Sequence, residues 1–200
     1  MRAAAQPLSR RSVLQELGEK FHSSPTLVRR MNPHSRFAAG EDIRVPNVLC
    51  VESEEAQPAR AEPEMITVVV SKKTSALTVV DRDGRIAFYA PVTSGSEHDP
   101  LPLWKWVVTL MQRDPVYYYN PDHFWDTDPT DATEKIAPGP NNPVGVVWIG
   151  IDKPHYGIHG TPQPALVGHS DSHGCVHLTN WDAGRVASMV KDGTPVVFEE

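Results

Sequence analysis

The sequence has few cysteines, no long hydrophobic run and no excess of positive charge. Two cysteines in 200 residues are too few for a framework of disulfides. No apolar run reaches the roughly 18 residues expected of a membrane-spanning helix, and residues 1–7 lack the hydrophobic region of a signal peptide. The formal net charge of -6 argues against a nucleic-acid partner, because such partners are held through their phosphates.

Two hundred residues provide enough chain for one or two small domains with a real core. The composition changes sharply at residues 51–64, which are acidic, rich in proline and alanine, and almost without apolar side chains. Such a segment cannot bury a hydrophobic face and is typical of a linker. We therefore expect a head of residues 1–50, a linker of residues 51–64 and a body of residues 65–200.

The head shows the spacing of two short helices. Apolar residues recur at helical intervals in residues 13–21 and 27–31, and Ser23 or Ser24 before Pro25 is suited to cap the second helix. A turn then leads into a predicted short strand. In this order the head resembles a LysM peptidoglycan-binding module, through Leu17, Phe21, Leu27, Met31, Asn32, Pro33, Gly40, Ile43, Val45 and Pro46. The alternative is a small helical cap that acts only as a spacer.

The body is rich in β-branched residues. We expect strands where these residues gather, at residues 66–70, 77–80, 86–90, 107–110, 146–149 and 196–198. Residues 81–84 have the composition of a hairpin turn. A helix is expected over residues 181–190, capped by Thr179 or Asn180 and ended near Gly193. This pattern predicts a mostly β fold, a β-sandwich or partly closed barrel with one or two helices.

The segments richest in chemistry are Ile158-His159-Gly160-Thr161 and Ser172-His173-Gly174-Cys175. A thiol attacks only as a thiolate, so a cysteine nucleophile needs an imidazole that takes its proton. His159 ends an apolar strand, which is a rigid place for a base. Cys175 lies four or five residues before the expected helix, whose positive end favours a thiolate. Gly174 leaves room for a substrate backbone, and adjacent N–H groups can form an oxyanion hole. These residues predict acyl transfer through a thioester.

The histidines around this cysteine leave a zinc site open as an alternative. Zinc takes nitrogen and sulfur ligands, and the candidates are His155, His159, His169, His173, Cys175 and His177. There is no CxxC pair and no second ligand cluster of familiar spacing, so we expect no metal and no cofactor. The other cysteine, Cys50, lies between Leu49 and Val51 and is interpreted as a small buried apolar residue.

Together with residues 92–95, 142–145 and 193–196, the two segments resemble the signature of the YkuD-type L,D-transpeptidases, the ErfK/YbiS-like cell-wall enzymes. The resemblance covers the whole body and implies a cysteine acyltransferase that acts on peptidoglycan stem peptides. It implies that Cys175 attacks the L-centre carbonyl of diaminopimelate in a donor tetrapeptide and expels D-alanine. The resulting thioester is then transferred to an acceptor amine.

The resemblance also implies the roles of the neighbouring residues. His159 would be the base, oriented by a backbone carbonyl near Gly160. His173, with the backbone of Gly174 and of the cysteine, would line the oxyanion region, and Ser172 would brace the loop.

Substrate recognition is the part in which this sequence departs from the family. Many members carry arginine two residues after the cysteine, where it suits a substrate carboxylate, but this chain has His177. Asn180 and Tyr156 are the other candidates for substrate binding, although Asn180 is also suited to cap the helix. Upstream aromatic residues either wall a glycopeptide cleft or pack in the core: Trp104, Trp106, Tyr117, Tyr118, Tyr119, Phe124 and Trp125.

Two alternatives to transpeptidation remain at this stage. The same thioester can pass to water, which gives an L,D-carboxypeptidase or a cross-link hydrolase. A protein that binds peptidoglycan without catalysis is the alternative from another class. Because peptidoglycan lies outside the inner membrane, we expect a location in the periplasm or cell envelope and infer a leader that this sequence does not show.

Overall fold

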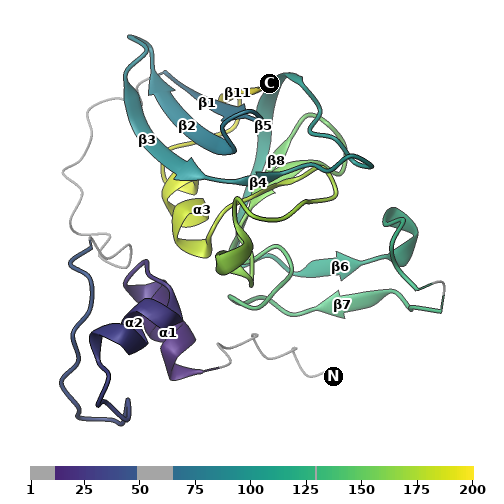
Figure 1. The fold of residues 1–200 in the computed structure, drawn as a ribbon. Helices are drawn as coiled ribbons and strands as arrows, with labels where there is room; N and C mark the ends of the chain where they lie inside the picture. The colour runs from purple at the N-terminus through teal and green to yellow at the C-terminus, as the bar shows by residue number, and fades with distance from the viewer. Residues whose placement is uncertain (1–11, 49–64, 129) are drawn as a thin grey trace, which may run out of the picture.

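The computed structural model describes residues 12–48, 65–128 and 130–200 (Figure 1). The head contains α1 (Val13–Lys20) and α2 (Pro25–Met31). The strands of the body are β1 (Ile66–Ser71), β2 (Ala76–Asp81), β3 (Ile86–Pro91), β4 (Thr93–Ser94), β5 (Trp104–Arg113), β6 (Tyr117–Tyr119), β7 (Glu134–Ile136), β8 (Val147–Ile151), β9 (Gly157–His159), β10 (Val176–His177) and β11 (Pro195–Glu199). Its helices are the 3-10 turns η2 (Pro121–His123) and η3 (Pro164–Leu166) and the α-helix α3 (Asn180–Ala187).

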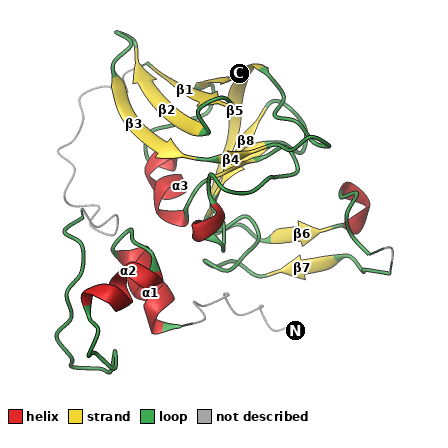
Figure 2. Cartoon of the chain, viewed as in Figure 1, coloured by secondary structure: helices red, strands yellow, loops and turns green. Residues whose placement is uncertain are grey.

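Among the described strands, nine form one sheet in the order β3-β2-β1-β11-β5-β8-β9-β10-β4. Strands β3 and β4 lie at opposite edges of this order, yet only Val92 separates them in the chain. The sheet must therefore curl until its two edges approach each other, as the strands in Figure 2 do. This nearly closed sheet confirms the mostly β fold expected from the sequence. Strands β6 and β7 form a separate hairpin that projects from the body (Figure 1).

Alternating side chains of the strands fill the inside of the curled sheet. In β1 the buried positions are Val68 and Val70, and in β11 they are Val196 and Phe198. These strands pair in parallel, with Val68 opposite Val196. Helix α3 adds its apolar face to the same core and packs on β8 and β9. The core therefore holds rigid the strands that carry the site described below.

The head packs against the N-terminal end of α3. The imidazole of His22 stacks on the indole of Trp181, with ring centroids 4.1 Å apart, and its Nε2 lies 3.4 Å from a carboxylate oxygen of Asp182. The side chains of Gln15 and Glu19 on α1 hydrogen-bond those of Asn141 and Asn180, respectively. Segments far apart in the sequence are therefore joined at one end of α3.

Several expected elements differ from those observed. Ser24 caps α2 with Pro25 in its first turn, as expected, but the short strand expected near Ile43 is absent from the described head. Helix α3 ends at Ala187, earlier than predicted, and Thr179 is its cap. The linker and Cys50 lie outside the described residues. Within the described ranges, no helix is long and apolar enough to cross a membrane.

Candidate active site

The two motifs meet because β9 and β10 pair in parallel. Strand β9 ends at His159, and the register places His177 of β10 directly opposite. Cys175 immediately precedes β10, and its Sγ donates a weak hydrogen bond to the carbonyl oxygen of His155, 3.6 Å away. The candidate base and the candidate nucleophile therefore lie on adjacent segments of one rigid strand pair.

Ser172 braces the loop that carries the cysteine. Its hydroxyl donates to the carbonyl oxygen of Cys175 at 2.6 Å and accepts from the backbone N–H of Gly95 at 2.7 Å. The backbone N–H of Ser172 donates to the carbonyl of Gly95 at 3.1 Å. A buried side chain thus bridges the loop to the segment after β4, which limits movement of the thiol.

Gly174 allows Tyr156 to pack beside the nucleophile. Its φ is +91°, and a Cβ at this position would lie 2.5 Å from Cε1 of Tyr156. Only glycine tolerates both the backbone conformation and the contact. Tyr156, which was expected to bind substrate, therefore borders the residue before Cys175.

Hydrogen bonding orients the buried imidazole of His159. Its Nδ1 lies 2.7 Å from the carbonyl oxygen of Gly160, which can only accept, so Nδ1 carries the proton. Nε2 of the neutral ring is then the atom available to accept a proton. The ring lies between the indole of Trp148 and the imidazole of His177, with centroid distances of 5.3 and 4.5 Å.

Burial keeps both candidate catalytic groups neutral in the resting site. Burial, which removes water from the ring, and then the neighbouring His177 lower the pKa of His159 to about 3. The hydrogen bond to Gly160 opposes this shift. Burial raises the pKa of the Cys175 thiol to about 11, although a backbone hydrogen bond at Gly157 opposes this shift. Near pH 7 the pair is therefore a thiol and a neutral imidazole.

This result corrects the expectation that the helix end favours a thiolate. Cys175 lies at the far end of β10 from α3, and its sulfur faces the backbone of His155 instead. Loss of hydration then outweighs the helix dipole, whose effect falls off within the first turn of a helix. A nucleophilic role for this thiol would therefore require a base that removes its proton.

The rate of alkylation of Cys175 by iodoacetamide is expected to rise about tenfold per pH unit between pH 7 and 10 without a plateau. Only the thiolate reacts, and a pKa of about 11 keeps its population rising over this whole range. Quantifying the labelled Cys175 peptide by mass spectrometry separates it from Cys50. A plateau below pH 8 would contradict a protonated resting thiol.

The side chain of Asn180 is buried and hydrogen-bonds backbone groups of the loop before β8. Its Oδ1 accepts from the N–H of Val146 at 3.2 Å, and its Nδ2 donates to the carbonyl of Pro140 at 3.1 Å. A Cβ added to Gly160 would lie 2.3 Å from this same Oδ1. The amide is buried against the residue that orients His159, so we assign Asn180 a positioning role.

Replacing Asn180 with alanine is expected to lower the free energy of unfolding by about 1 to 3 kcal/mol, because buried polar backbone groups lose their partner. Urea unfolding measures this change. The matched variant Asn141→Ala, at a less buried amide in the loop between β7 and β8, is expected to cost under about 1 kcal/mol. Equal stability of Asn180→Ala and wild type would contradict the positioning role.

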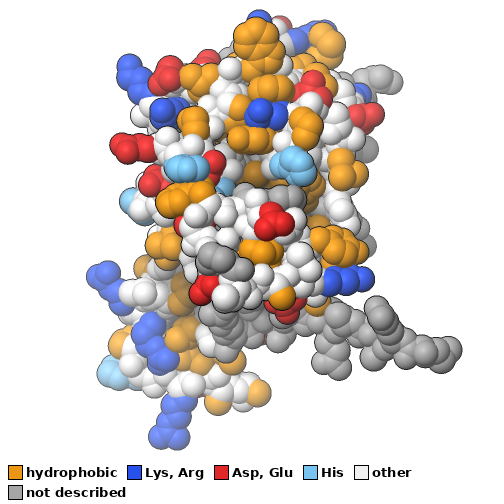
Figure 3. Space-filling model, turned by 90° about the vertical axis from the view of Figure 1, so that its right-hand side faces the viewer, with side chains coloured by type: hydrophobic (Ala, Val, Ile, Leu, Met, Phe, Trp, Pro, Cys, Tyr) orange, Lys and Arg blue, Asp and Glu red, His pale blue; other side chains and the backbone are white. Residues whose placement is uncertain are grey.

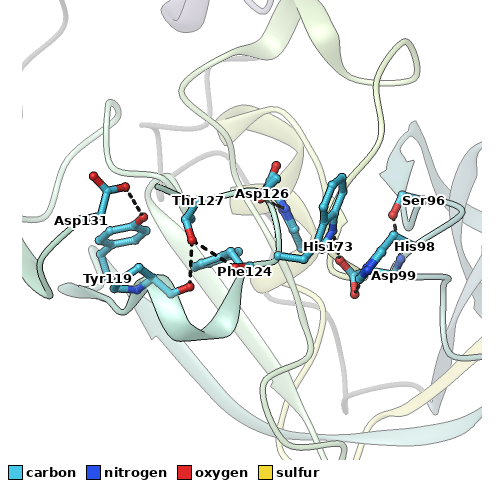
Figure 4. A network of polar contacts seen from close by, with 11 residues as sticks. Ser96, His98, Asp99, Tyr119, Phe124, Asp126, Thr127, Asp131 and His173 are labelled. Atoms are coloured by element: carbon cyan, nitrogen blue, oxygen red, sulfur yellow. Dashed lines mark hydrogen bonds and ion pairs between the residues drawn. The ribbon is translucent and has the colours of Figure 1, made fainter. Parts of the chain in front are cut away.

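His173 belongs to a wall of polar and aromatic side chains that also contains Phe124 and Asp126 (Figure 4). Its Nε2 lies 2.8 Å from Oδ1 of Asp126, and its ring meets the edge of Phe124. The indole N–H of Trp125 donates to Asp99 at 2.9 Å, which joins this wall to the loop after β4. On the face that bears the β6–β7 hairpin, hydrophobic and histidine side chains lie next to one another (Figure 3).

Sequence reasoning named His173 and the aromatic residues of this wall but missed their carboxylate partners, Asp126 and Asp99. Asp126 is 47 positions from His173 in the chain, and no local sequence pattern predicts that the two side chains pair. Tyr117 in β6 also lies near the nucleophile: burial, and then the adjacent Cys175, raises its pKa. As for the zinc alternative, no group of three potential ligands is arranged for a metal in the described ranges.

Residues 66–198 match the family of L,D-transpeptidase catalytic domains known as YkuD. A protein of Bacillus licheniformis named as L,D-transpeptidase YkuD is 25% identical over 186 residues, which are 92% of this chain and 91% of that protein. The protein named as L,D-transpeptidase YqjB of Bacillus subtilis is 29% identical over 139 residues, which are 66% of this chain and 70% of that protein.

Solved structures share the fold of the body. An L,D-transpeptidase from Mycobacterium smegmatis superimposes with a TM-score of 0.55 at 18% identity over 68% of this chain. L,D-transpeptidase 3 from Mycobacterium tuberculosis, in complex with a faropenem-derived adduct, gives a TM-score of 0.55 at 22% identity, also over 68% of this chain. The matched region spans 59% and 61% of those longer chains, respectively.

Proposed function

Because this chain belongs to the YkuD family of L,D-transpeptidase catalytic domains, we propose that it is a cysteine-dependent L,D-transpeptidase of peptidoglycan. The donor is a stem tetrapeptide, and the acceptor is an amine of a second stem peptide. The observation that carries this proposal is the parallel pairing of β9 with β10: His159 ends β9, Cys175 directly precedes β10, and the Gly160 carbonyl fixes Nδ1 of His159. Nucleophile and base oriented in this way suit acyl transfer.

In the first step the sulfur of Cys175 bonds to the L-centre carbonyl carbon of diaminopimelate, and Nε2 of His159 takes the thiol proton. The backbone N–H groups of Gly174 and Cys175 stabilise the oxyanion. The carbon–nitrogen bond then breaks, and the imidazolium returns the proton to the amine of the departing D-alanine. His173, whose Nε2 lies 2.8 Å from Oδ1 of Asp126, is proposed to line the oxyanion region.

In the second step an acceptor amine attacks the thioester, loses a proton to His159 and releases the thiol. Water can replace the amine and yield an L,D-carboxypeptidase. The neutral state of His159 near pH 7 serves both outcomes, since each needs a base that is free to accept a proton.

The head is proposed to bind glycan, as a LysM-like module does. The proposal rests on the resemblance of the head sequence to LysM modules; the alignment with the Bacillus licheniformis protein, over 92% of this chain, extends into the head. The substrate places the protein in the periplasm or cell envelope.

Incubation with a disaccharide-tetrapeptide, followed by mass spectrometry of the products, tests the function. We expect free D-alanine together with a cross-linked dimer. D-alanine without dimer would assign the carboxypeptidase reaction. If neither product forms with the folded protein, the proposal is wrong.

A further inference from the structure

A turn between β8 and β9 holds a lysine at the edge of the site. The N–H of Tyr156 donates to the carbonyl of Lys153 at 3.2 Å, and His155 has a φ of +67°. Pro154 in second position and a positive φ in third position follow the pattern of a type II turn. Such a turn brings its first and last residues side by side, so the side chains of Lys153 and Tyr156 can meet.

Two aromatic rings clamp the ammonium of Lys153. Its Nζ lies 4.6 Å from the ring centroid of Tyr156 and 5.7 Å from that of Trp106. Tyr156 is the ring that packs against Gly174, immediately before Cys175. The lysine charge is therefore held on the ring that borders the nucleophile, and not at the end of a freely moving side chain.

The carboxylates near this lysine are engaged by other groups. Asp152 accepts a hydrogen bond from the N–H of Val107 at 2.9 Å. Asp99, whose charge also acts on Tyr156, accepts from the indole of Trp125 and lies 3.4 Å from His98. Within the described part of the chain, Lys153 forms no ion pair, so its charge is available to a ligand.

Two other candidates for binding a substrate carboxylate, His177 and Asn180, are unsuitable. The ring of His177 lies 4.5 Å from that of His159. Burial, followed by the effect of His173, lowers the pKa of His177 to about 4, so it is uncharged near pH 7. Asn180 is buried and bonded to backbone.

We propose that Lys153 binds the terminal carboxylate of the donor stem peptide and thereby selects donors that end in a free acid. This inference rests on the proposed function. The carbonyl that Cys175 attacks and the carboxylate of the departing D-alanine are separated by one nitrogen and one Cα, about 4 Å at most by standard bond lengths. A cation on the ring beside the thiol is therefore suitably placed for this carboxylate.

The test compares two donors, the disaccharide-tetrapeptide and the same molecule ending in D-alaninamide. Wild-type enzyme is expected to favour the acid by roughly tenfold to a hundredfold in kcat/KM, mainly through a lower KM, because a charged hydrogen bond is made in the ground state as well. In Lys153→Met the kcat/KM for the acid donor should fall to that for the amide donor. The kcat/KM for the amide donor should be the same as in the wild type. Lys153→Arg should retain most of the preference.

Lys135→Met is the matched control, because Lys135 also lies over a tyrosine, Tyr118, in the hairpin, and it should keep the wild-type preference. Lys153→Gln replaces Lys153→Met if the methionine variant fails to fold. A preference for the acid that survives loss of Lys153, or a wild type with no preference, would overturn this inference while leaving the proposed function intact. If the folded wild type releases neither D-alanine nor D-alaninamide, both this inference and the proposed function are wrong.

Discussion

Replacement of Cys175 by serine is expected to reduce the release of D-alanine from a disaccharide-tetrapeptide by a factor on the order of 10⁴ or more. Serine matches the size of cysteine, so the bond from Ser172 to the residue 175 carbonyl and the fold should persist. A hydroxyl is a far weaker acid than a thiol. Proton transfer to His159 is therefore much less favourable from serine than from cysteine.

D-alanine release, followed by mass spectrometry, measures this loss, and thermal unfolding checks that the variant is folded. Cys50→Ser provides the matched control, since it removes the other cysteine of the chain, and it should keep full activity. Wild-type activity in Cys175→Ser would contradict a thiol nucleophile.

Replacement of His159 by glutamine is expected to lower kcat by a factor of about 10² to 10⁴, the range typical of a lost general base. The glutamine amide can still donate to the Gly160 carbonyl and fill the space between Trp148 and His177. It cannot accept the thiol proton. The variant therefore separates loss of the base from loss of packing.

The matched control is His169→Gln, because His169 is an exposed histidine between the two motifs and should retain activity. The wild-type pH profile adds a second check. With a pKa of about 3 for His159, kcat/KM should show no decline from protonation of the base between pH 7 and 5. Equal kcat in His159→Gln and wild type would assign the base elsewhere.

The sequence predicts the long elements of the fold because local patterns of branched, apolar and capping residues indicate them. Branched residues in β1 and β11 gave both strands, and Ser24 with Pro25 gave the start of α2. Strands β4 and β10 have only two residues each. They exist because the curled sheet brings its edges together, which no local pattern records.

The site divides in the same way. His159 and Cys175 stand in motifs that can be read directly, and the parallel pairing of β9 with β10 brings those motifs together. The partner of His173, Asp126, comes from a distant loop. The protonation state of the thiol depends on burial in three dimensions, so the motif identifies a candidate nucleophile but predicts the wrong resting charge for it.

Acylation of Cys175 is the central claim, and intact-protein mass spectrometry tests it most directly. Rapid quenching of the enzyme with disaccharide-tetrapeptide is predicted to give an adduct whose mass is the donor less D-alanine, and peptide mapping should place it on Cys175. The thioester mechanism would be contradicted if the donor is turned over while Cys175 stays unmodified at every time point and remains fully open to alkylation.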